Sequence, residues 1–410
     1  MKKMFVSAAA ILLLLSLASC FANRANETVP TTSEAPADAI TYSTASDPEP
    51  RATTAEPPQI TASTTDRAAE TELTTKAPEE SVTTVTEPDN TGKPFTLAVA
   101  GDVSFADNGY TYPNAVSKGY SIEDCFGASL LEKMRGSEIF LINNESCYSD
   151  RGSPLNGKLY TFRAATEHAE LLYELGVDIA CIANNHIWDY GSDAFLDTLE
   201  TLENIGMPYI GGGHNEEEAY TPYYTEMNGV KLAFLAATRI EKVFHAKNEA
   251  SGDDYGICCI FEPDRLVEAI KEADKNADYV IVYAHWGKEY TEKLEDVQRE
   301  YAHAFIDAGA DIVLGAHPHI LQGMEFYEGK PIFYSLGNYW FNLKSLDTAL
   351  LRIEFADGGC ELYLDPARQV DGVTTEITDE NKRNEFFSHL EDISVNAAIT
   401  SDGRVYEKSN

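Results

Sequence analysis

The stretch VDIACIANNHIWDYG, residues 177 to 191, joins an apolar run to a cluster of polar side chains. Residues 177–183 have the continuous apolar character of a buried strand. Directly after them come two amides, an imidazole and a carboxylate, in Asn184, Asn185, His186 and Asp189. In open α/β sheets, functional groups gather where the strands end. This stretch therefore predicts a central strand with a functional site at its end.

Five further apolar runs alternate with amphipathic segments along the chain. We expect buried strands at residues 95–101, 138–143, 177–183, 231–237, 278–284 and 311–316. We expect helices at residues 122–134, 166–176, 192–206, 262–277 and 294–309, several of which end at Gly or Asn. The alternation predicts an α/β fold with mainly parallel central strands. A hairpin about EGK within residues 324–338 and two more strands, at 350–355 and 360–364, are expected to follow.

The N-terminus reads as a secretory signal. Lysines at positions 2 and 3 precede an apolar core that is short for a membrane span, and Leu17, Ala18 and Ser19 lead into Cys20. This order resembles the bacterial lipobox, which implies lipidation of Cys20 and a lipid-anchored protein on the outer face of the cytoplasmic membrane. The alternative is an ordinary signal peptide with an incidental cysteine.

Four segments are expected. Residues 1–20 form the signal, and residues 21–93 are a disordered linker rich in Thr, Glu, Pro, Ala and Ser, with too little apolar surface to fold. Residues 94–366 form one folded domain, and residues 367–410 a C-terminal extension.

The charge balance limits the possible partners. The chain has 67 acidic and 31 basic residues, for a net charge of -36. A nucleic acid partner is excluded, because phosphate binding requires a basic surface. An anionic substrate would need a local device such as metal ions to hold it against the overall field.

Six cysteines follow Cys20, and their spacing gives no disulfide framework. Cys181 lies inside a predicted strand, Cys258 and Cys259 are adjacent, and no CxxC pair occurs. We expect mostly free, structural thiols. The six are Cys125, Cys147, Cys181, Cys258, Cys259 and Cys360.

Ligand-type residues recur at the ends of the predicted strands. They are Asp102, Asn143, Glu145, Asn184, Asn185, His186, Asp189, His285, Glu289, His317 and His319. Taken alone, Asp102 suits a helix cap and His285 suits an ordinary buried histidine. In GAHPH, Pro318 stiffens the link between His317 and His319, whose side chains would point the same way in an extended segment. Carboxylate, amide and imidazole ligands without thiolates favour Mn, Fe or Zn ions.

The ordered blocks GD, N-x-E, ANNHxxDxG, HWGxE, GAHPH and SLGN resemble the CapA family, associated with bacterial poly-γ-glutamate capsule synthesis. The resemblance runs from about Phe95 to Phe355. The family's domain is similar to calcineurin-like metallophosphatases, which implies a four-layer α/β/β/α sandwich and two divalent metal ions.

The resemblance also implies roles by position. Asn185, His285 and His317 would hold one ion, and Asp102, Glu145 and His319 would hold the other, with Glu145 bridging. His186 would be the acid that faces the leaving group, and Asp189 would orient its ring. Asn338 in SLGN would order a loop near the site or be a plain turn residue.

Two positions depart from the metallophosphatase pattern. Asp102, Val103 and Ser104 replace the usual Asp-x-His, which removes one imidazole ligand, and the bridging residue is Glu in place of Asp. These departures put full two-metal occupancy in question.

Three functions fit the sequence. The first is a role in biosynthesis or export of the poly-γ-glutamate capsule, with membrane-bound synthesis proteins as partners and the metals binding the anionic polymer. The second is a metal-dependent phosphoesterase or other hydrolase at the cell surface. The third is an assembly platform without chemistry. The His186 position favours the hydrolase, because a proton donor is redundant for gripping carboxylates. Arg163, Arg239 and Lys288 are cations that could offset the acidic field.

Overall fold

The computed structural model describes residues 92–240 and 248–409. The expected signal, Cys20 and the linker up to residue 91 therefore lie outside the described residues. The described chain belongs to one compact unit, Thr83–Asn410. Gly92, the first described residue, is held to the fold by its backbone N–H, which donates to the Asn228 carbonyl at 2.9 Å.

The first sheet carries ten strands within the described residues. In spatial order they are β19 (Ala397–Ile399), β20 (Arg404–Glu407), β17 (Gly359–Val370), β16 (Leu346–Ala356), β1 (Phe95–Val103), β2 (Ile139–Asn144), β5 (Ile179–Cys181) and β6 (Tyr209–Ile210). Off this path, β15 (Asn338–Trp340) pairs with β1, and β18 (Val373–Glu376) pairs with β17. Strands β1, β2, β5 and β6 are parallel, while β16 runs antiparallel to β1.

The second sheet has six strands in the same part of the chain. Their order is β13 (Met324–Tyr327), β14 (Lys330–Phe333), β12 (Ile312–Ala316), β11 (Tyr279–His285), β9 (Val230–Thr238) and β8 (Tyr223–Met227). The inner four are parallel, and β13 and β8 close the edges antiparallel. The expected hairpin is confirmed, with Glu328 and Gly329 at its turn.

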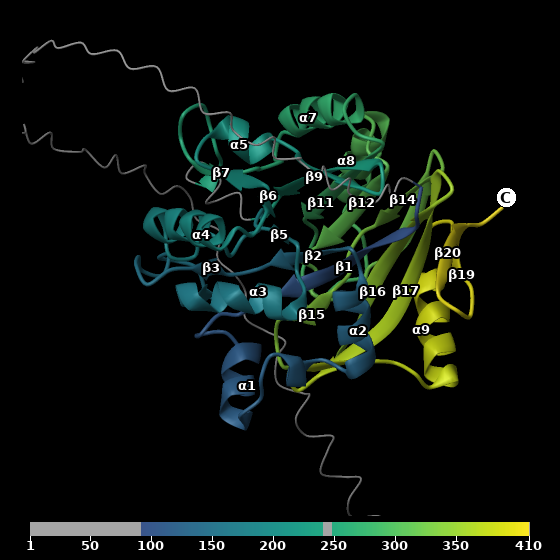
Figure 1. The fold of residues 1–410 in the computed structure, drawn as a ribbon, viewed down its shortest axis with the longest axis horizontal. Coiled ribbons are helices and arrows are strands. Elements are labelled where there is room, and N and C mark those ends of the chain that lie inside the picture. The colour runs from purple at the N-terminus through teal and green to yellow at the C-terminus, as the bar shows by residue number, and fades with distance from the viewer. Residues whose placement is uncertain (1–91, 241–247, 410) are drawn as a thin grey trace, which may run out of the picture. The chain divides into compact units, whose positions relative to one another are not determined.

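Helices cover the outer faces of both sheets (Figure 1). They are α1 (Thr111–Lys118), α2 (Ala128–Gly136), α3 (Glu170–Leu175), α4 (Ser192–Ile205), α5 (Glu216–Tyr220), α7 (Asp264–Asp274) and α8 (Asp296–Asp307). A further helix, α9 (Glu380–Asp392), packs Phe386, Phe387 and Leu390 into the apolar layer between the two sheets. Short elements complete the described part of the chain: η1 (Glu123–Cys125), η2 (Thr166–Ala169), β3 (Cys147–Tyr148), β4 (Arg163–Ala164), β7 (Gly212–Gly213) and β10 (Gly256–Ile257). Among the described residues, no helix has both the length and the apolar character needed to span a membrane.

The alternation of side chains along the strands builds three apolar layers. In β1, Leu97 and Val99 face the second sheet, whereas Ala98 and Ala100 face helices such as α2. The other face of the second sheet packs under α7 and α8. Successive strand residues point to opposite faces, so a strand buried on both sides is apolar throughout. The expected four-layer α/β/β/α sandwich is confirmed.

One expected helix is wrong. Residues 122–134 do not form a single helix, because Phe126 has extended backbone angles (φ -132°, ψ 143°) between η1 and α2. Phe126 bridges to Thr374, and the Gly127 N–H donates to the Thr374 carbonyl at 2.8 Å. Pairing with a segment distant in the sequence therefore overrides the local helical pattern.

The expectation of free thiols is confirmed for the described residues. Cys125, Cys147, Cys181, Cys258 and Cys259 are buried and free, and Cys360 in β17 is half-buried and free. Burial raises the pKa of Cys125 to about 11. These thiols therefore serve as small apolar side chains.

Candidate metal centre

The predicted ligands meet where the parallel strands of the two sheets end. Asp102 lies in β1, Glu145 directly follows β2, and Asn185 follows β5. From the second sheet, His285 is the last residue of β11, and the turn after β12 carries His317 and His319. The centre thus lies across the two sheets and belongs to neither alone.

Two overlapping groups of side chains could each hold a metal ion. Glu145, His285 and His317 form one group, and Asp102, Glu145 and His319 form the other. Within each group, one ligand atom from every residue lies within 4.8 Å of the others. Asn185 adds its Oδ1 atom 2.8 Å from His285 Nε2. Glu145 is common to both groups, as a bridging carboxylate must be.

The donor set fits divalent cations. Glu145 Oε1 and His317 Nδ1 are buried and have no hydrogen-bond partner. Burial and the neighbouring Asp102 hold the pKa of Glu145 well above its usual range, and burial with nearby imidazoles holds the pKa values of His285 and His317 well below theirs. A bound cation would satisfy the buried carboxylate, and neutral imidazoles are the form that binds metals.

The backbone at the GAHPH block differs from expectation. The segment is a bend, with positive φ at His317 (93°) and His319 (62°), so the argument from an extended segment is wrong. The two rings still lie close, with centroids 5.7 Å apart, but they join different ligand groups. Non-glycine residues rarely adopt positive φ, and such strain concentrates at functional sites.

Three buried asparagines hold the ligands in place. Asn143 Nδ2 donates to Asp102 Oδ1 at 2.8 Å, and Asn184 Nδ2 donates to Asn143 Oδ1 at 3.1 Å. Asn338 Oδ1 lies 2.8 Å from His319 Nδ1. Asn338 therefore orders the site and is not a plain turn residue, since its backbone pairs with Asp102 across β15 and β1.

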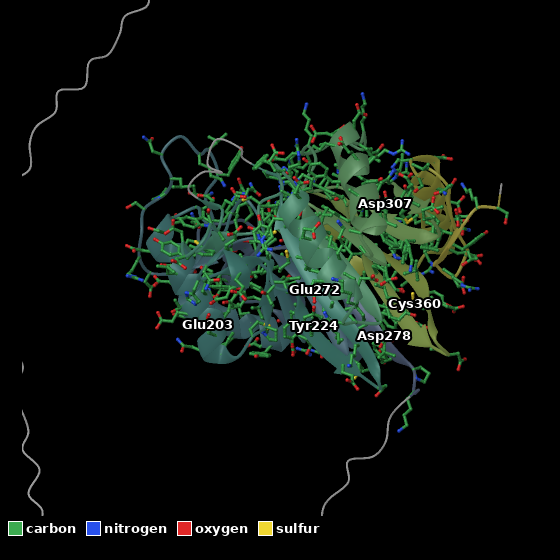
Figure 2. All side chains as sticks on the ribbon, turned by 90° about the horizontal axis from the view of Figure 1, so that it is seen from above. Glu203, Tyr224, Glu272, Asp278, Asp307 and Cys360 are labelled. Carbon is green, nitrogen blue, oxygen red and sulfur yellow. The ribbon has the colours of Figure 1, made fainter. Side chains whose placement is uncertain are left out.

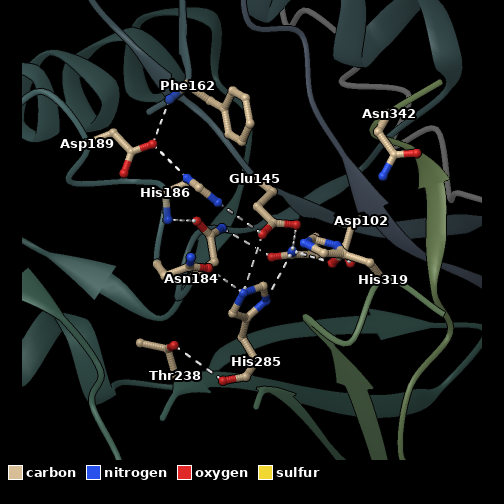
Figure 3. A network of polar contacts seen from close by, with 12 residues as sticks. Asp102, Glu145, Phe162, Asn184, His186, Asp189, Thr238, His285, His319 and Asn342 are labelled. Atoms are coloured by element: carbon tan, nitrogen blue, oxygen red, sulfur yellow. Dashed lines mark hydrogen bonds and ion pairs between the residues drawn. The ribbon is translucent and has the colours of Figure 1, made fainter. Parts of the chain in front are cut away.

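His186 is held at the edge of the centre by a carboxylate (Figure 3). Its Nδ1 donates to Asp189 Oδ2 at 2.6 Å, and its Nε2 lies 3.8 Å from Glu145 Oε1. Asp189 is fully buried; Phe162 N–H donates to its Oδ2 at 2.6 Å, and Lys158 Nζ lies 2.6 Å from its Oδ1. The Asp189 contact fixes the ring so that Nε2 faces the ligands.

The departure at position 104 is visible in the structure. Ser104 is buried, and its hydroxyl accepts a hydrogen bond from the Ala106 backbone N–H at 3.4 Å. Position 104 thus makes a local backbone contact where the metallophosphatase pattern has a ligand.

A cavity of about 560 Å³ lies over the centre and reaches His186, Asn185 and His319. Lys158 and Lys344 are its cations. Arg163, Arg239 and Lys288 do not line it. Lys158 and Lys344 had no signal in the sequence, because both lie in loops without a strand-end motif. Glu289 does line the cavity mouth.

Known proteins are similar to this chain in the region that carries the metal centre. The sequence model of the family described as "Bacterial capsule synthesis protein PGA_cap" matches residues 96–343. A capsule biosynthesis protein CapA of Bacillus anthracis is 33% identical over 255 residues, which cover 60% of each chain. A PGA biosynthesis protein CapA of Bacillus subtilis is 36% identical over 198 residues, covering 47% of this chain and 51% of the relative. The chain thus spans between half and two thirds of the length of these relatives.

Among solved structures, a hypothetical protein from Thermus thermophilus matches with a TM-score of 0.42 and 17% identity, covering 67% of this chain and 99% of that chain. A NAD nucleotidase from Haemophilus influenzae matches with a TM-score of 0.40 and 13% identity, covering 74% of this chain and 64% of that chain. These scores are too low to support an inference about the site.

The matched residues 96–343 include every proposed ligand from Asp102 to His319, together with His186, Asp189 and Asn338. The match covers more than half of the chain. The protein belongs to the bacterial capsule synthesis protein (PGA_cap) family.

Proposed function

We propose that this protein acts in the biosynthesis or export of an anionic surface polymer, poly-γ-glutamate, and that its metal centre carries out a hydrolytic step there. Family membership supports the pathway, as does the similarity to the two CapA proteins, which are named for capsule and PGA biosynthesis. Membrane-bound synthesis proteins are the proposed partners.

The ligand groups suggest how two ions would be held. Asn185, His285 and His317 would bind one, and Asp102 and His319 the other, with Glu145 between them. Mn, Fe and Zn all suit these oxygen and nitrogen donors. When bound, such a pair of ions polarises the scissile bond and lowers the pKa of a bound water.

The observation that carries a hydrolytic role is the His186–Asp189 contact of 2.6 Å. Asp189 accepts the Nδ1 hydrogen and keeps Nε2 directed at the cavity, where the doubly protonated ring can give its Nε2 proton to a leaving group. A centre that only bound carboxylates would have no use for this pair. Asp189 does not touch the cavity itself, so its role is to position His186.

The test replaces His186 with Ala. Because His186 is a proposed proton donor and not a ligand, His186→Ala should keep wild-type metal content and lower turnover roughly 100-fold. His389→Ala removes an exposed imidazole on α9 and is the matched control, with both quantities unchanged. Metal per chain is measured by elemental analysis, and function by restoration of surface polymer in a strain lacking the protein.

The outcomes for His186→Ala distinguish a catalytic centre from a centre that only binds. Full metal with full restoration of polymer would mean that the centre binds and does not catalyse. Lost metal would mean that His186 is itself a ligand. Loss of polymer with full metal supports the proposal.

A second candidate is a phosphoesterase unrelated to the capsule, favoured by the same His186 geometry and by the shared carboxylate of Glu145. It predicts His186-dependent hydrolysis of simple phosphoesters by the purified protein, with no change in surface polymer when the protein is absent.

A further inference from the structure

Exposed apolar side chains concentrate around the mouth of the cavity over the metal centre. Leu159 is 84% exposed and Tyr160 is 53% exposed, although both are apolar or aromatic. With them at the mouth are Tyr110, Tyr290 and Leu343, which are also exposed. Isolated exposed apolar residues are ordinary, but a group around one cavity marks a binding surface.

The mouth carries almost no net charge. Lys158 is neutralised by its ion pair with Asp189 at 2.6 Å, and its side chain is only 5% exposed. Lys344 lies over the ring of Tyr290, with Nζ 3.4 Å from the ring centroid, and Glu289 lines the same mouth. Beyond the metal centre, the cavity therefore has no surplus of positive charge to receive a chain of carboxylates.

The net charge of the whole protein also disfavours binding of a polyanion. At a net charge of -36, it repels a polyanion, and acidic side chains such as Glu203, Glu272 and Asp307 project from its surface (Figure 2). Such repulsion grows with the number of negative charges on the ligand. A ligand with a single anionic group meets far less of it than a polymer does.

The paired aromatic rings of the cavity wall leave no gap between them for a flat ligand. Phe162 packs edge-on against both Tyr110 (65°) and Phe341 (83°). The near-parallel pair of rings lining this part of the described chain is His319 and Phe341, whose centroids are 4.6 Å apart and thus already in contact. A sandwich around a third ring needs roughly twice the usual stacking distance. A flexible aliphatic group fits these walls better than a planar one.

We propose that the metal centre takes an amphiphile: one anionic head group held at the metals, joined to an aliphatic chain that lies against Leu159, Leu343 and the tyrosines of the mouth. This inference deepens the proposed function, because it rests on the metal centre binding an anion and names the class of molecule that reacts there. The free polymer is then the product or cargo of the pathway and not the ligand of this cavity.

The first test measures binding of methyl, butyl and octyl phosphate to the manganese-loaded protein by calorimetry, with octyl phosphate below its micelle concentration. Each methylene buried from water favours binding by a factor of roughly four, and partial burial reduces it. We expect octyl phosphate to bind at least about tenfold tighter than methyl phosphate. Equal affinity along the series would overturn the proposal.

Two further ligands test the shape and charge of the mouth. Phenyl phosphate should bind more weakly than octyl phosphate, and a γ-linked glutamate oligomer should bind more weakly still. Tighter binding of phenyl phosphate would favour a planar ligand. Tighter binding of the oligomer would make the polymer the direct ligand. Either result contradicts the amphiphile.

Variants localise the effect. Leu159→Asn and Leu343→Asn should weaken octyl phosphate binding severalfold and leave methyl phosphate unchanged, since both side chains are exposed and their loss leaves the fold intact. Val116 is an exposed apolar side chain on α1 that does not line the cavity. Val116→Asn is therefore the control and should change the affinity for neither phosphate. If Leu159→Asn or Leu343→Asn weakened the binding of octyl and methyl phosphate equally, the substitution would act on the metal centre. That result would refute binding of the aliphatic chain at the mouth.

Failure of this inference is distinct from failure of the proposed function. A chain-length effect in a protein whose loss leaves surface polymer intact would support the amphiphile and reject the capsule role. Restoration of polymer by Leu159→Asn together with no chain-length effect would support the capsule role and reject the amphiphile.

Discussion

Lys158 shows how much one buried side chain outside every motif can contribute. Its ammonium lies 2.6 Å from the fully buried Asp189 and also donates to the Asn185 carbonyl, so it links the carboxylate that positions His186 to a proposed ligand. Lys158→Met keeps the apolar stem and removes the charge. Because a buried carboxylate would lose its cation, we expect the free energy of unfolding to fall by about 3 kcal/mol.

Urea unfolding checks this prediction against Lys271→Met, which breaks an exposed ion pair with Glu268 on α7. Exposed pairs are screened by water, so the control should lose less than about 1 kcal/mol. Similar losses in the two variants would mean that Lys158 does not hold a buried charge.

At the level of elements, β1 and the chain before β15 approach so closely that only glycine fits. A Cβ atom on Gly101 would lie 1.9 Å from the Gly337 carbonyl oxygen, beside the 3.0 Å hydrogen bond from Asp102 N–H to that oxygen. Gly101→Ala should therefore separate the two strands, lower the free energy of unfolding by about 3 kcal/mol and reduce metal content.

Gly136→Ala at the end of α2 is the control, because no atom lies within 4 Å of its added Cβ. Gly136→Ala should leave both the metal content and the strand packing unchanged. Thermal unfolding and metal analysis measure both variants. Wild-type metal in Gly101→Ala would show that the strands can shift without disturbing Asp102.

Glu325 in β13 connects the second sheet to α8, and its contacts should make the free energy of unfolding depend on pH. Burial by itself raises the pKa of Glu325, but hydrogen bonds from Arg299 and Tyr334 outweigh it and hold the pKa below the usual value of 4.5. A lowered pKa in the folded state stabilises the protein above the unfolded value, and this contribution is lost as pH falls through the folded value.

The difference in unfolding free energy between wild type and Glu325→Gln should thus be greatest above pH 4.5 and shrink at lower pH. Urea unfolding at a series of pH values measures it. A difference that stays constant across the series would show that the carboxylate charge is not what connects these elements.

At the scale of the whole molecule, we propose that Cys20, which lies outside the described residues, carries a lipid that anchors the protein. Cys20→Ser removes the thiol that accepts the lipid, so the protein should move from the membrane pellet to the soluble fraction. Cys360→Ser, a half-buried cysteine in β17, should stay in the pellet. Retention of Cys20→Ser in the pellet after a high-salt wash would contradict lipid anchoring.

The sequence by itself determined the central strands, several glycine-ended helices and the residues placed at the strand ends, whereas β8, β18, β19, β20 and α9 were not predicted. Helices α3 and α4 do end at Gly176 and Gly206 in left-handed backbone, as expected. These features depend on neighbours within a few residues, so a local pattern contains them. The candidate ligands followed from the same strand ends and from the order of the family motifs.

Only the tertiary structure decided which residues meet across the fold. It placed Lys158 on Asp189, brought Asn338 to His319, shared Glu145 between two ligand groups and broke a helix at Phe126 by pairing it with Thr374. It also gathered Leu159 and Leu343 at one mouth. Each of these contacts joins residues well separated in the chain, and their meeting depends on how strands, loops and sheets pack in three dimensions, which no local pattern encodes.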